Sequence, residues 1–372
     1  MTDNKLILHA LGTSGGPVNT KTQGFLFQLN NEFFMIDGGT GLSSIVELFK
    51  PQYMKENKID KVAYLYSSIN DIAEFNDEIS VKSSINKFTS KNLSICNLEK
   101  LNFNDKFEGN NVIEKSMDLY FRIQKNFITH PHLDHINELI INLPILYGTG
   151  HPELKKVIYG SSTCTQYIQD HILNGKTWPN LINENPLSIY NPKIALQELA
   201  DNQKFDVCSG ISLIRMNLNH GECEIDNKLC TVESSCYIIL EKLNKHMHLI
   251  FGDCEWDDVN FPLLITKVNN LINSGHKLKT MVIECSSIND NNVTDLYGHM
   301  NPELLCKTLS EFKHTFNQND KINLCITHVK QTINKKDPRE VILQQLTDDL
   351  EKSGLNMYLE ISVLINGLSY RL

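Results

Sequence analysis

The chain has 372 residues, 41% of them hydrophobic, and a formal net charge of −9 at pH 7. This length allows one large or two ordinary domains, and the excess of acidic residues argues against broad nucleic-acid binding, which needs a basic face to neutralise phosphates. No apolar run approaches the ~20 residues that span a bilayer, and the N-terminus has no signal-peptide pattern, so we expect a cytoplasmic protein without a membrane partner.

The ten cysteines are scattered along the chain and contain no C-x-x-C pair. Cys236, Cys254 and Cys285 lie in or beside apolar, strand-like runs, where a reduced thiol packs as a small hydrophobic group. We therefore expect reduced cysteines and no disulfide framework.

The N-terminal region predicts strands joined by tight turns. Strands are predicted at residues 6–11, 25–29 and 33–36, and a helix at about 42–49. The turn at residues 12–17 is rich in glycine but lacks the lysine of a phosphate-binding loop, so we interpret it as structural. Asp37 follows the third strand, and two roles stay open for it: support of a metal ligand, or capping of the next helix.

Residues 51–111 are rich in Asn, Lys, Ser and Glu and show only weak periodicity. This composition predicts an insertion of short helices and loops on the outside of the core.

The densest group of ligand-capable side chains follows a predicted strand that ends at residue 128. His130, His132, Asp134 and His135 lie within six positions, and a helix with an apolar side begins directly after them. A His-x-His pair on an extended turn can direct both imidazoles at one ion. Imidazole and carboxylate groups without a thiolate suit zinc or a related divalent metal in an open, catalytic site.

The C-terminal half predicts strands that end in polar side chains. Further strands are predicted at residues 156–160, 212–218, 235–240, 248–251, 280–284, 323–327 and 359–365, and helices at about 163–171, 301–314 and 337–352. The ligand-capable residues at or just after these strands are His220, Asp253, Glu284 and His328, and His299 lies before a predicted helix. The pattern indicates two sheets with helices outside, in one catalytic domain over residues 1–372.

This order of residues resembles the metallo-β-lactamase superfamily and, within it, the class II cyclic-nucleotide phosphodiesterases of the fungal low-affinity cyclic AMP type. The similar blocks are GTSGGP (12–17), DGG (37–39), THPHLDHI (129–136), GDCE (252–255), IECS (283–286), YGH (297–299), THVK (327–330) and KDPR (336–339). The resemblance implies an α/β fold, the αββα sandwich of two mixed β-sheets flanked by helices.

The resemblance also implies a site with two divalent metal ions, for which zinc is the first expectation. His130, His132 and His220 would hold one ion, and Asp134, His135 and His328 the other, with Asp253 bridging them. The implied reaction is hydrolysis of a 3′,5′-cyclic nucleotide to the 5′-monophosphate by a hydroxide that both ions bind.

Three residues have implied catalytic roles. Asp134 would orient the nucleophile, His299 would protonate the leaving 3′ oxygen, and Glu284 would orient His299. Two alternatives stay open: His299 as a ligand or as part of a helix cap, and Glu284 as simple support of the ligands. Two residues depart from the class pattern, which has Gly or Ser at the position of Glu138 and Ser at the position of Leu143. Whether these departures affect local packing or substrate contacts stays open.

Two other functions share the ligand set. One is an RNA 3′-end processing endonuclease of the same fold, against which the acidic composition argues because such an enzyme needs a basic surface. The other is a non-catalytic binding protein, which is disfavoured because no ligand is missing. The expected partner is a cyclic nucleotide, namely cyclic AMP and also cyclic GMP. We expect no nucleic-acid partner. The pattern is compatible with a homodimer.

Overall fold

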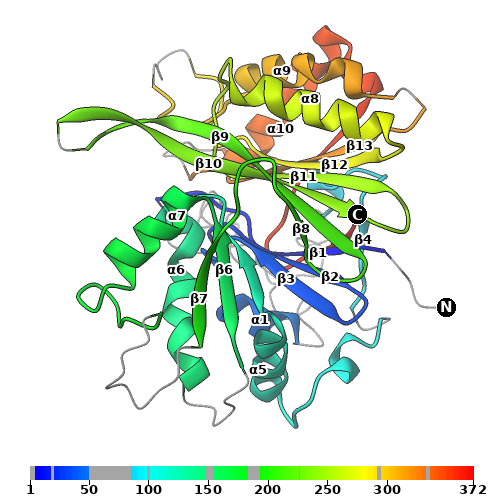
Figure 1. The fold of residues 1–372 in the computed structure, drawn as a ribbon. Coiled ribbons are helices and arrows are strands. Elements are labelled where there is room, and N and C mark those ends of the chain that lie inside the picture. The colour runs from blue at the N-terminus through cyan, green and yellow to red at the C-terminus, as the bar shows by residue number, and fades with distance from the viewer. Residues whose placement is uncertain are drawn as a thin grey trace.

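Two β-sheets stack face to face, with helices covering the outer face of each (Figure 1). The computed structural model describes residues 5–17, 21–49, 85–98, 101–147, 154–182, 193–225, 227–290, 295–317, 319–331 and 336–372. The predicted αββα sandwich of two mixed sheets is confirmed by this arrangement.

The first sheet has eight strands in the order β4-β15-β1-β2-β3-β5-β6-β7. In that order they are Ser94–Ile95, Ser369–Arg371, Ile7–Gly12, Gly24–Leu29, Glu32–Ile36, Lys125–Phe127, Lys156–Gly160 and Ile194–Glu198. From β4 to β3 the neighbours are antiparallel, and from β3 to β7 they are parallel.

The second sheet has seven strands in the order β14-β13-β12-β11-β10-β9-β8. In that order they are Leu359–Val363, Ile322–Thr327, Lys277–Glu284, His246–Phe251, Lys228–Glu241, Ile211–Ile225 and Lys204–Asp206. From β14 to β11 the neighbours are parallel, and from β11 to β8 they are antiparallel. Each sheet is therefore divided into an antiparallel part and a parallel part that reaches one of its edges.

The helices divide between the two outer faces (Figure 1). Those on the first sheet are α1 (Leu42–Leu48), α5 (Val112–Arg122), α6 (Leu133–Asn142) and α7 (Ser162–Tyr167). Those on the second sheet are α8 (Asn260–Asn273), α9 (Pro302–Glu311) and α10 (Pro338–Ser353). Short 3-10 or π turns lie at Phe103–Lys106, Leu143–Tyr147, Ile168–Ile172, Lys313–Thr315 and Leu355–Met357.

Alternation along the strands of the first sheet builds two hydrophobic clusters. On β2, Phe25 and Phe27 join the cluster that includes the second sheet, whereas Leu26 joins the cluster under α1, α5 and α6. On β3, Phe34 and Met35 divide in the same way. Successive side chains of a strand point to opposite faces, so both faces of this sheet are buried.

Two helices begin as their sequences predict. Asn301 caps α9 by accepting a hydrogen bond from the Leu304 N–H, and Asp337 caps α10 by accepting one from the Arg339 N–H. A proline follows each cap at the first helical position, where its missing N–H costs nothing. Gly354 ends α10 in the left-handed conformation, with φ 68°.

Part of the predicted insertion at residues 51–111 packs into the hydrophobic clusters. Residues 51–84 lie outside the described residues, but Phe88, Leu93 and Phe103 are buried in the hydrophobic clusters. The strand β4 also extends the first sheet by pairing with β15. The segment from residue 85 onward therefore contributes to the core. Its few apolar residues are separated by many polar ones, so the sequence shows no hydrophobic periodicity of a helix or strand there.

The sequence pattern also missed several elements. It did not predict α5, α8, β7 or β8, and it ended the strand before His220, whereas β9 continues to residue 225. Beyond the sheet, β9 and β10 pair only with each other as a two-stranded ribbon, which projects from the body in Figure 1. Such a ribbon has no buried face, so its polar residues carry no alternating signal.

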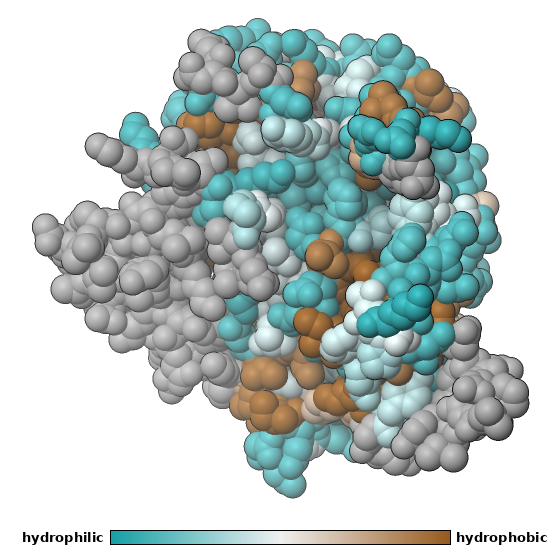
Figure 2. Space-filling model, turned by 90° about the vertical axis from the view of Figure 1, so that its left-hand side faces the viewer, coloured by the Kyte–Doolittle hydropathy of each residue, from teal (hydrophilic) through white to brown (hydrophobic). Residues whose placement is uncertain are grey.

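The surface shown in Figure 2 is mainly hydrophilic in its upper part, with hydrophobic residues in its lower middle. Among the described residues, no helix combines the length and the apolar character that crossing a membrane requires.

Glu138 and Leu143, the two departures from the family pattern, have structural roles in this chain. Glu138 of α6 accepts hydrogen bonds from the Gly41 N–H at 2.8 Å and the Ser43 hydroxyl at 2.6 Å, at the N-terminus of α1. One turn later, Asn142 accepts from the Leu42 N–H at 3.0 Å. Helix α1 has no capping side chain of its own, so α6 supplies the cap. Leu143 is fully buried in the cluster beneath α6.

Replacing Glu138 should therefore destabilise the fold. We expect Glu138→Ala to lower the free energy of unfolding by ~1–2 kcal/mol, because it removes an acceptor and a negative charge from a helix N-terminus. Urea unfolding of the purified protein measures this. Glu138→Gln, which keeps an acceptor oxygen, should lose less, and Ile141→Ala on the exposed side of α6 serves as the control. Equal stability of Glu138→Ala and the wild type would contradict the capping role.

Candidate metal centre

The ligand-capable residues gather at one edge of the sandwich because parallel strands of both sheets end there. The first sheet delivers Asp37 after β3 and His130 shortly after β5, and the second delivers Asp253 after β11, Glu284 at the end of β12 and His328 after β13. His220 reaches the same edge from within β9, where the strand passes from the sheet into the ribbon. The carboxyl ends of parallel strands are the usual place for a site in an α/β protein.

The turn from β5 to α6 places its four polar residues in different local settings. His130 is fully buried, while His132 stands at the N-cap of α6 with an extended backbone, φ −65° and ψ 149°. Asp134 lies in the first turn of the helix, where a carboxylate is favoured by the helix dipole. His135 points inward and is fully buried. A Cβ on Gly39 would lie 1.8 Å from the Asp134 carbonyl oxygen, so this packing requires glycine.

The structure brings together all seven residues that the sequence proposed as ligands. They form two groups whose ligand atoms lie within 4.8 Å of one another: His130, His132 and His220 in one, and Asp134, His135, Asp253 and His328 in the other. Asp253 belongs to the second group, and a third group within the same distance consists of His220, Glu284 and His299.

Asp253 lies between the two groups. Its Oδ2 is 3.8 Å from Nε2 of both His130 and His220, and 3.3 and 3.2 Å from Nε2 of His135 and His328. Nε2 of His328 is also 3.1 Å from Oδ2 of Asp134. One carboxylate oxygen therefore faces imidazoles of both groups, as a bridging ligand would.

The donor set fits divalent cations. Nε2 of His130 and Oδ1 of Asp253 are buried without a hydrogen-bond partner among the described residues. A buried polar atom without a partner is costly, and a metal ion would satisfy both atoms. Imidazole nitrogens with carboxylate oxygens are typical ligands of zinc and related ions.

Charge in the cluster is shared among closely packed groups. Burial, together with the neighbouring His135, holds the pKa of His130 well below its usual value, which favours the neutral imidazole that can bind a metal. Burial also opposes charge on His135, but Asp253 and Asp37 raise its pKa well above the usual value. Likewise, burial opposes ionisation of Asp253, yet His328 and His135 hold the pKa of Asp253 well below normal. The buried carboxylate of Asp253 thus favours positive charge in its surroundings, as the raised pKa of His135 shows.

Asp37 supports the ligands, which decides between its two expected roles. It accepts hydrogen bonds from the Thr129 N–H at 2.9 Å and from Nδ1 of His135 at 2.9 Å. This contact leaves Nε2 of His135 free to face Asp253 and fixes the ring orientation. The N-cap of α1 is Gly41, so Asp37 does not cap that helix.

The glycine-rich turn at residues 12–17 contacts the site. The Thr13 carbonyl accepts a hydrogen bond from the His328 N–H at 2.7 Å, and the Gly16 N–H donates to Oδ2 of Asp134 at 3.3 Å. His328 adopts a left-handed backbone with φ 56°, which is uncommon for histidine and is held here by the surrounding bonds.

Glu284 and His299 form a buried ion pair beside the ligands. Nδ1 of His299 lies 3.1 and 3.0 Å from the two carboxylate oxygens of Glu284. Glu284 also accepts from the Cys254 N–H at 2.7 Å, which fixes its position. Burial opposes charge on His299, but Glu284 raises the pKa of the imidazole above its usual value. This pairing leaves Nε2 of His299 as the ring nitrogen that is not committed to Glu284.

Ser286 is a site residue that the sequence reasoning did not single out. Its hydroxyl lies 3.0 Å from Nδ1 of His328 and hydrogen-bonds to Oε2 of Glu284. If Nε2 of His328 binds a metal, its Nδ1 carries the proton and donates to Ser286, whose hydroxyl then donates to Glu284. Ser286 therefore connects the ligand group to the Glu284–His299 pair. Its position two residues after Glu284 was the available signal.

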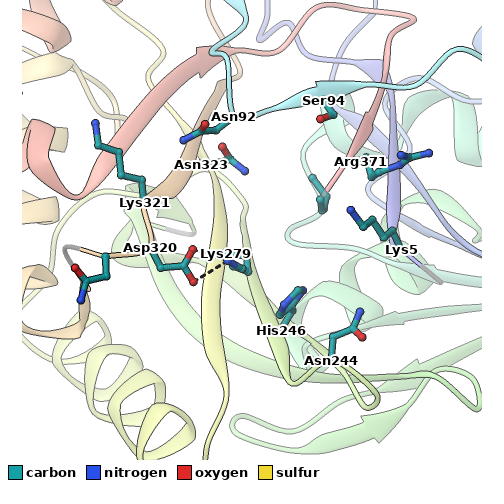
Figure 3. Close-up of a pocket in the computed structure, with 12 residues that line it drawn as sticks. Lys5, Asn92, Ser94, Asn244, His246, Lys279, Asp320, Lys321, Asn323 and Arg371 are labelled. Atoms are coloured by element: carbon teal, nitrogen blue, oxygen red, sulfur yellow. Dashed lines mark hydrogen bonds and ion pairs between the residues drawn. The ribbon is translucent and has the colours of Figure 1, made fainter. Parts of the chain in front are cut away.

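A cavity of about 590 Å³ lies at the opposite ends of the strands, where residues of both sheets line it (Figure 3). Lys279, near the start of β12, lines it and pairs with Asp320 at 2.6 Å, whereas Glu284 at the other end of β12 belongs to the ligand cluster. Five residues of strand separate the two by roughly 17 Å. This cavity is therefore not part of the candidate metal centre.

The chain is similar to known proteins over nearly its whole length. Residues 34–367 match the family described as class-II cAMP phosphodiesterases. The 3′,5′-cyclic-nucleotide phosphodiesterase 1 of Saccharomyces cerevisiae is 31% identical over 96% of both chains. The 3′,5′-cyclic-nucleotide phosphodiesterase of Schizosaccharomyces pombe is 24% identical over 97% of this chain and 92% of the relative.

Solved structures agree with the fold. The crystal structure of unliganded yeast PDE1 superposes with a TM-score of 0.81 at 27% identity, covering 99% of both chains. The metallo-beta-lactamase fold protein YhfI of Bacillus subtilis, at 14% identity and a TM-score of 0.51, shares the fold. By the family match and the identity to its relatives, this chain belongs to the class-II cAMP phosphodiesterase family.

Proposed function

We propose that this enzyme hydrolyses 3′,5′-cyclic AMP, and also cyclic GMP, to the 5′-monophosphates. The reaction would use two divalent cations at the candidate metal centre. The main support for the proposal is that two groups of potential metal ligands both face Oδ2 of Asp253. Membership of the class-II cAMP phosphodiesterase family supports a cyclic nucleotide as the substrate.

The proposed ligands follow the two groups in the structure. His130, His132 and His220 would hold one cation, and Asp134, His135 and His328 the other, with Asp253 between them. Two such cations would act as Lewis acids. They would neutralise phosphate charge and lower the pKa of a water molecule bound to them. Zinc is the metal that we propose, because imidazole and carboxylate together suit it.

The protein's own groups would orient the nucleophile and handle the proton. A hydrogen bond from His328 outweighs burial and keeps the pKa of Asp134 below its usual value, so this carboxylate stays ionised and can orient a water molecule. In the hydrolysis, the oxygen of water bonds to phosphorus and the bond from phosphorus to the ribose 3′ oxygen breaks.

The 3′ oxygen leaves as a poor alkoxide unless it receives a proton. His299 is the proposed donor, because Glu284 holds its Nδ1 and favours the charged imidazolium. After the transfer, the single product is a 5′-monophosphate with a free 3′ hydroxyl; His299 is neutral, and a proton from the attacking water passes to solvent.

The acidic composition supports a small-molecule substrate over RNA. A net charge of −9 provides no general basic surface for a polyanion, whereas cations at the site would attract one cyclic phosphate locally. The complete ligand set supports an enzyme over a binding protein of the same fold. A cytoplasmic location and a homodimer stay predictions.

Hydrolysis assays test the proposed function directly. We expect purified protein to convert cyclic AMP and cyclic GMP to 5′-AMP and 5′-GMP, and we expect a chelator to abolish both activities and added zinc to restore them. Chromatography identifies the isomer of each product. Formation of the 3′-monophosphate, or cleavage of an RNA 3′ end in preference to both cyclic nucleotides, would contradict the proposal.

The role of His299 as an acid predicts a dependence on the leaving group. We expect His299→Asn to lower kcat for cyclic AMP by ~10²–10⁴-fold, the usual contribution of a general acid. A p-nitrophenyl phosphodiester, whose leaving group needs no proton, should be affected far less. His314→Asn, on an exposed histidine remote from the site, is the matched control. Equal losses on both substrates would instead indicate a role in binding metal or in structure.

Removal of the Ser286 hydroxyl should weaken metal binding. We expect Ser286→Ala to lower metal affinity by ~10–100-fold, because it deprives His328 of the group that orients its ring. Competition against a chromophoric chelator measures this affinity. The adjacent Ser287→Ala should match the wild type, since no hydrogen bond of the Ser287 hydroxyl is seen among the described residues. Unchanged affinity in Ser286→Ala would refute this support.

A further inference from the structure

The ribbon formed by β9 and β10 carries two cysteines at opposite positions. In the register of these antiparallel strands, Cys223 of β9 faces Cys230 of β10, beside the pairs Glu224 with Leu229 and Glu222 with Thr231. The turn between the strands makes neighbours of two residues that are seven positions apart in sequence. This spacing matches no common cysteine motif, so the sequence alone does not show the pair.

The register gives this pair the geometry that a disulfide needs. Directly opposite residues of an antiparallel pair have Cα atoms ~4.5–5.5 Å apart and side chains on the same face of the ribbon. A disulfide accepts Cα separations of ~4.4–6.8 Å. Both cysteines are free thiols in the structure, so a bond between them needs only side-chain rotation and a small closure of the ribbon.

Exposure distinguishes this pair from most of the other thiols. Cys223 and Cys230 are half-buried, and the neighbouring Glu222, Glu224 and Leu229 are exposed, so a small oxidant can reach the ribbon. By contrast, burial raises the pKa of the Cys236 and Cys254 thiols well above the usual value, and that of Cys325 to about 12. Thiols that are buried and protonated react slowly.

Position on the strand connects the pair to the candidate metal centre. His220 precedes Cys223 by three residues on β9, and Nδ1 of His220 donates to the Gly298 carbonyl at 2.8 Å. Between them, Gly221 has φ 72° and packs against Gly298, where an added Cβ would lie 3.0 Å from the Gly298 Cα. The ribbon thus begins where β9 holds both a proposed ligand and the loop that carries His299.

We propose that Cys223 and Cys230 are a modification site, a dithiol that a peroxide oxidises reversibly to a disulfide and that thereby locks the ribbon next to His220. One thiolate sulfur attacks a peroxide oxygen, the O–O bond breaks, and a sulfenic acid and one water form. The second sulfur then attacks the sulfenyl sulfur, the S–O bond breaks, and another water leaves. The two thiols lose two protons and two electrons to the peroxide, and a dithiol reductant reverses the change by exchange.

Mass spectrometry of the folded, full-length protein tests the proposal. Trypsin cuts after Arg215, Lys228 and Lys242, which places the two cysteines in separate peptides, residues 216–228 and 229–242. After hydrogen peroxide treatment and alkylation of the remaining thiols, we expect these peptides to be joined. Their joint mass should be two hydrogens below the sum of the two peptides with Cys236 alone alkylated, and dithiothreitol should separate them.

Single substitutions identify the partners. Cys223→Ser and Cys230→Ser should each abolish the link, whereas Cys208→Ser, at another half-buried thiol, should leave it intact. The second peptide also contains Cys236, so a link that survives in Cys230→Ser would show the wrong pairing and overturn the proposal. So would oxidation of Cys223 and Cys230 to separate sulfinic acids, or a link that forms only in urea.

Hydrogen exchange tests the locking of the ribbon. Backbone amides of residues 219–233 should exchange more slowly in the oxidised protein than in the reduced one, because the link suppresses opening of the paired strands. The same treatment should change nothing there in Cys223→Ser. Equal exchange in the linked and reduced wild type would refute the lock.

Discussion

The constraint on which this structure depends is the burial of several imidazoles around a single carboxylate, Asp253. Its Oδ2 lies within 3.8 Å of a nitrogen of His130, His135, His220, His299 and His328. The buried carboxylate needs positive charge nearby. The imidazoles cannot all be protonated, however, because like charges at these distances repel in a medium of low polarity. Divalent cations would resolve this conflict, since they would satisfy the carboxylate and the neutral imidazoles together.

Specific hydrogen bonds from the surrounding fold hold these groups in place. Asp37 orients His135, the Gly298 carbonyl orients His220, and Ser286 orients His328. These supports come from both sheets and from loops far apart in sequence, so the site forms only when the two halves of the sandwich pack correctly. The hydrophobic cluster between the sheets therefore helps to position the site, because each proposed group of ligands takes residues from both sheets.

The sequence predicted those parts of the molecule that strong local patterns specify. Buried parallel strands such as β12 and β13 are short apolar runs that end in a single polar residue, so both the strands and Glu284 or His328 were visible. The seven candidate ligands follow from the H-x-H-x-D-H turn and the order of the later residues. Asn301-Pro302 and Asp337-Pro338 marked two helix starts because the cap and the proline act locally.

The remainder depends on contacts that no local pattern records. Glu138 caps α1 from a different helix, and Ser286 acts through His328, which is 42 residues away. Phe88 and Phe103 are core residues within a polar segment, and their burial is decided by the sheet that β4 extends. The pairing of Cys223 with Cys230 needs the register of the ribbon, which the polar sequence around it does not reveal.

The central claim is that this edge of the sandwich binds two divalent cations that share Asp253. Elemental analysis of protein saturated with zinc and freed of excess by gel filtration tests it directly, with Asp253→Asn treated in parallel. We expect two zinc ions per chain in the wild type and at most one in the variant. A wild type that retains fewer than two ions, or a variant that retains both, would contradict it.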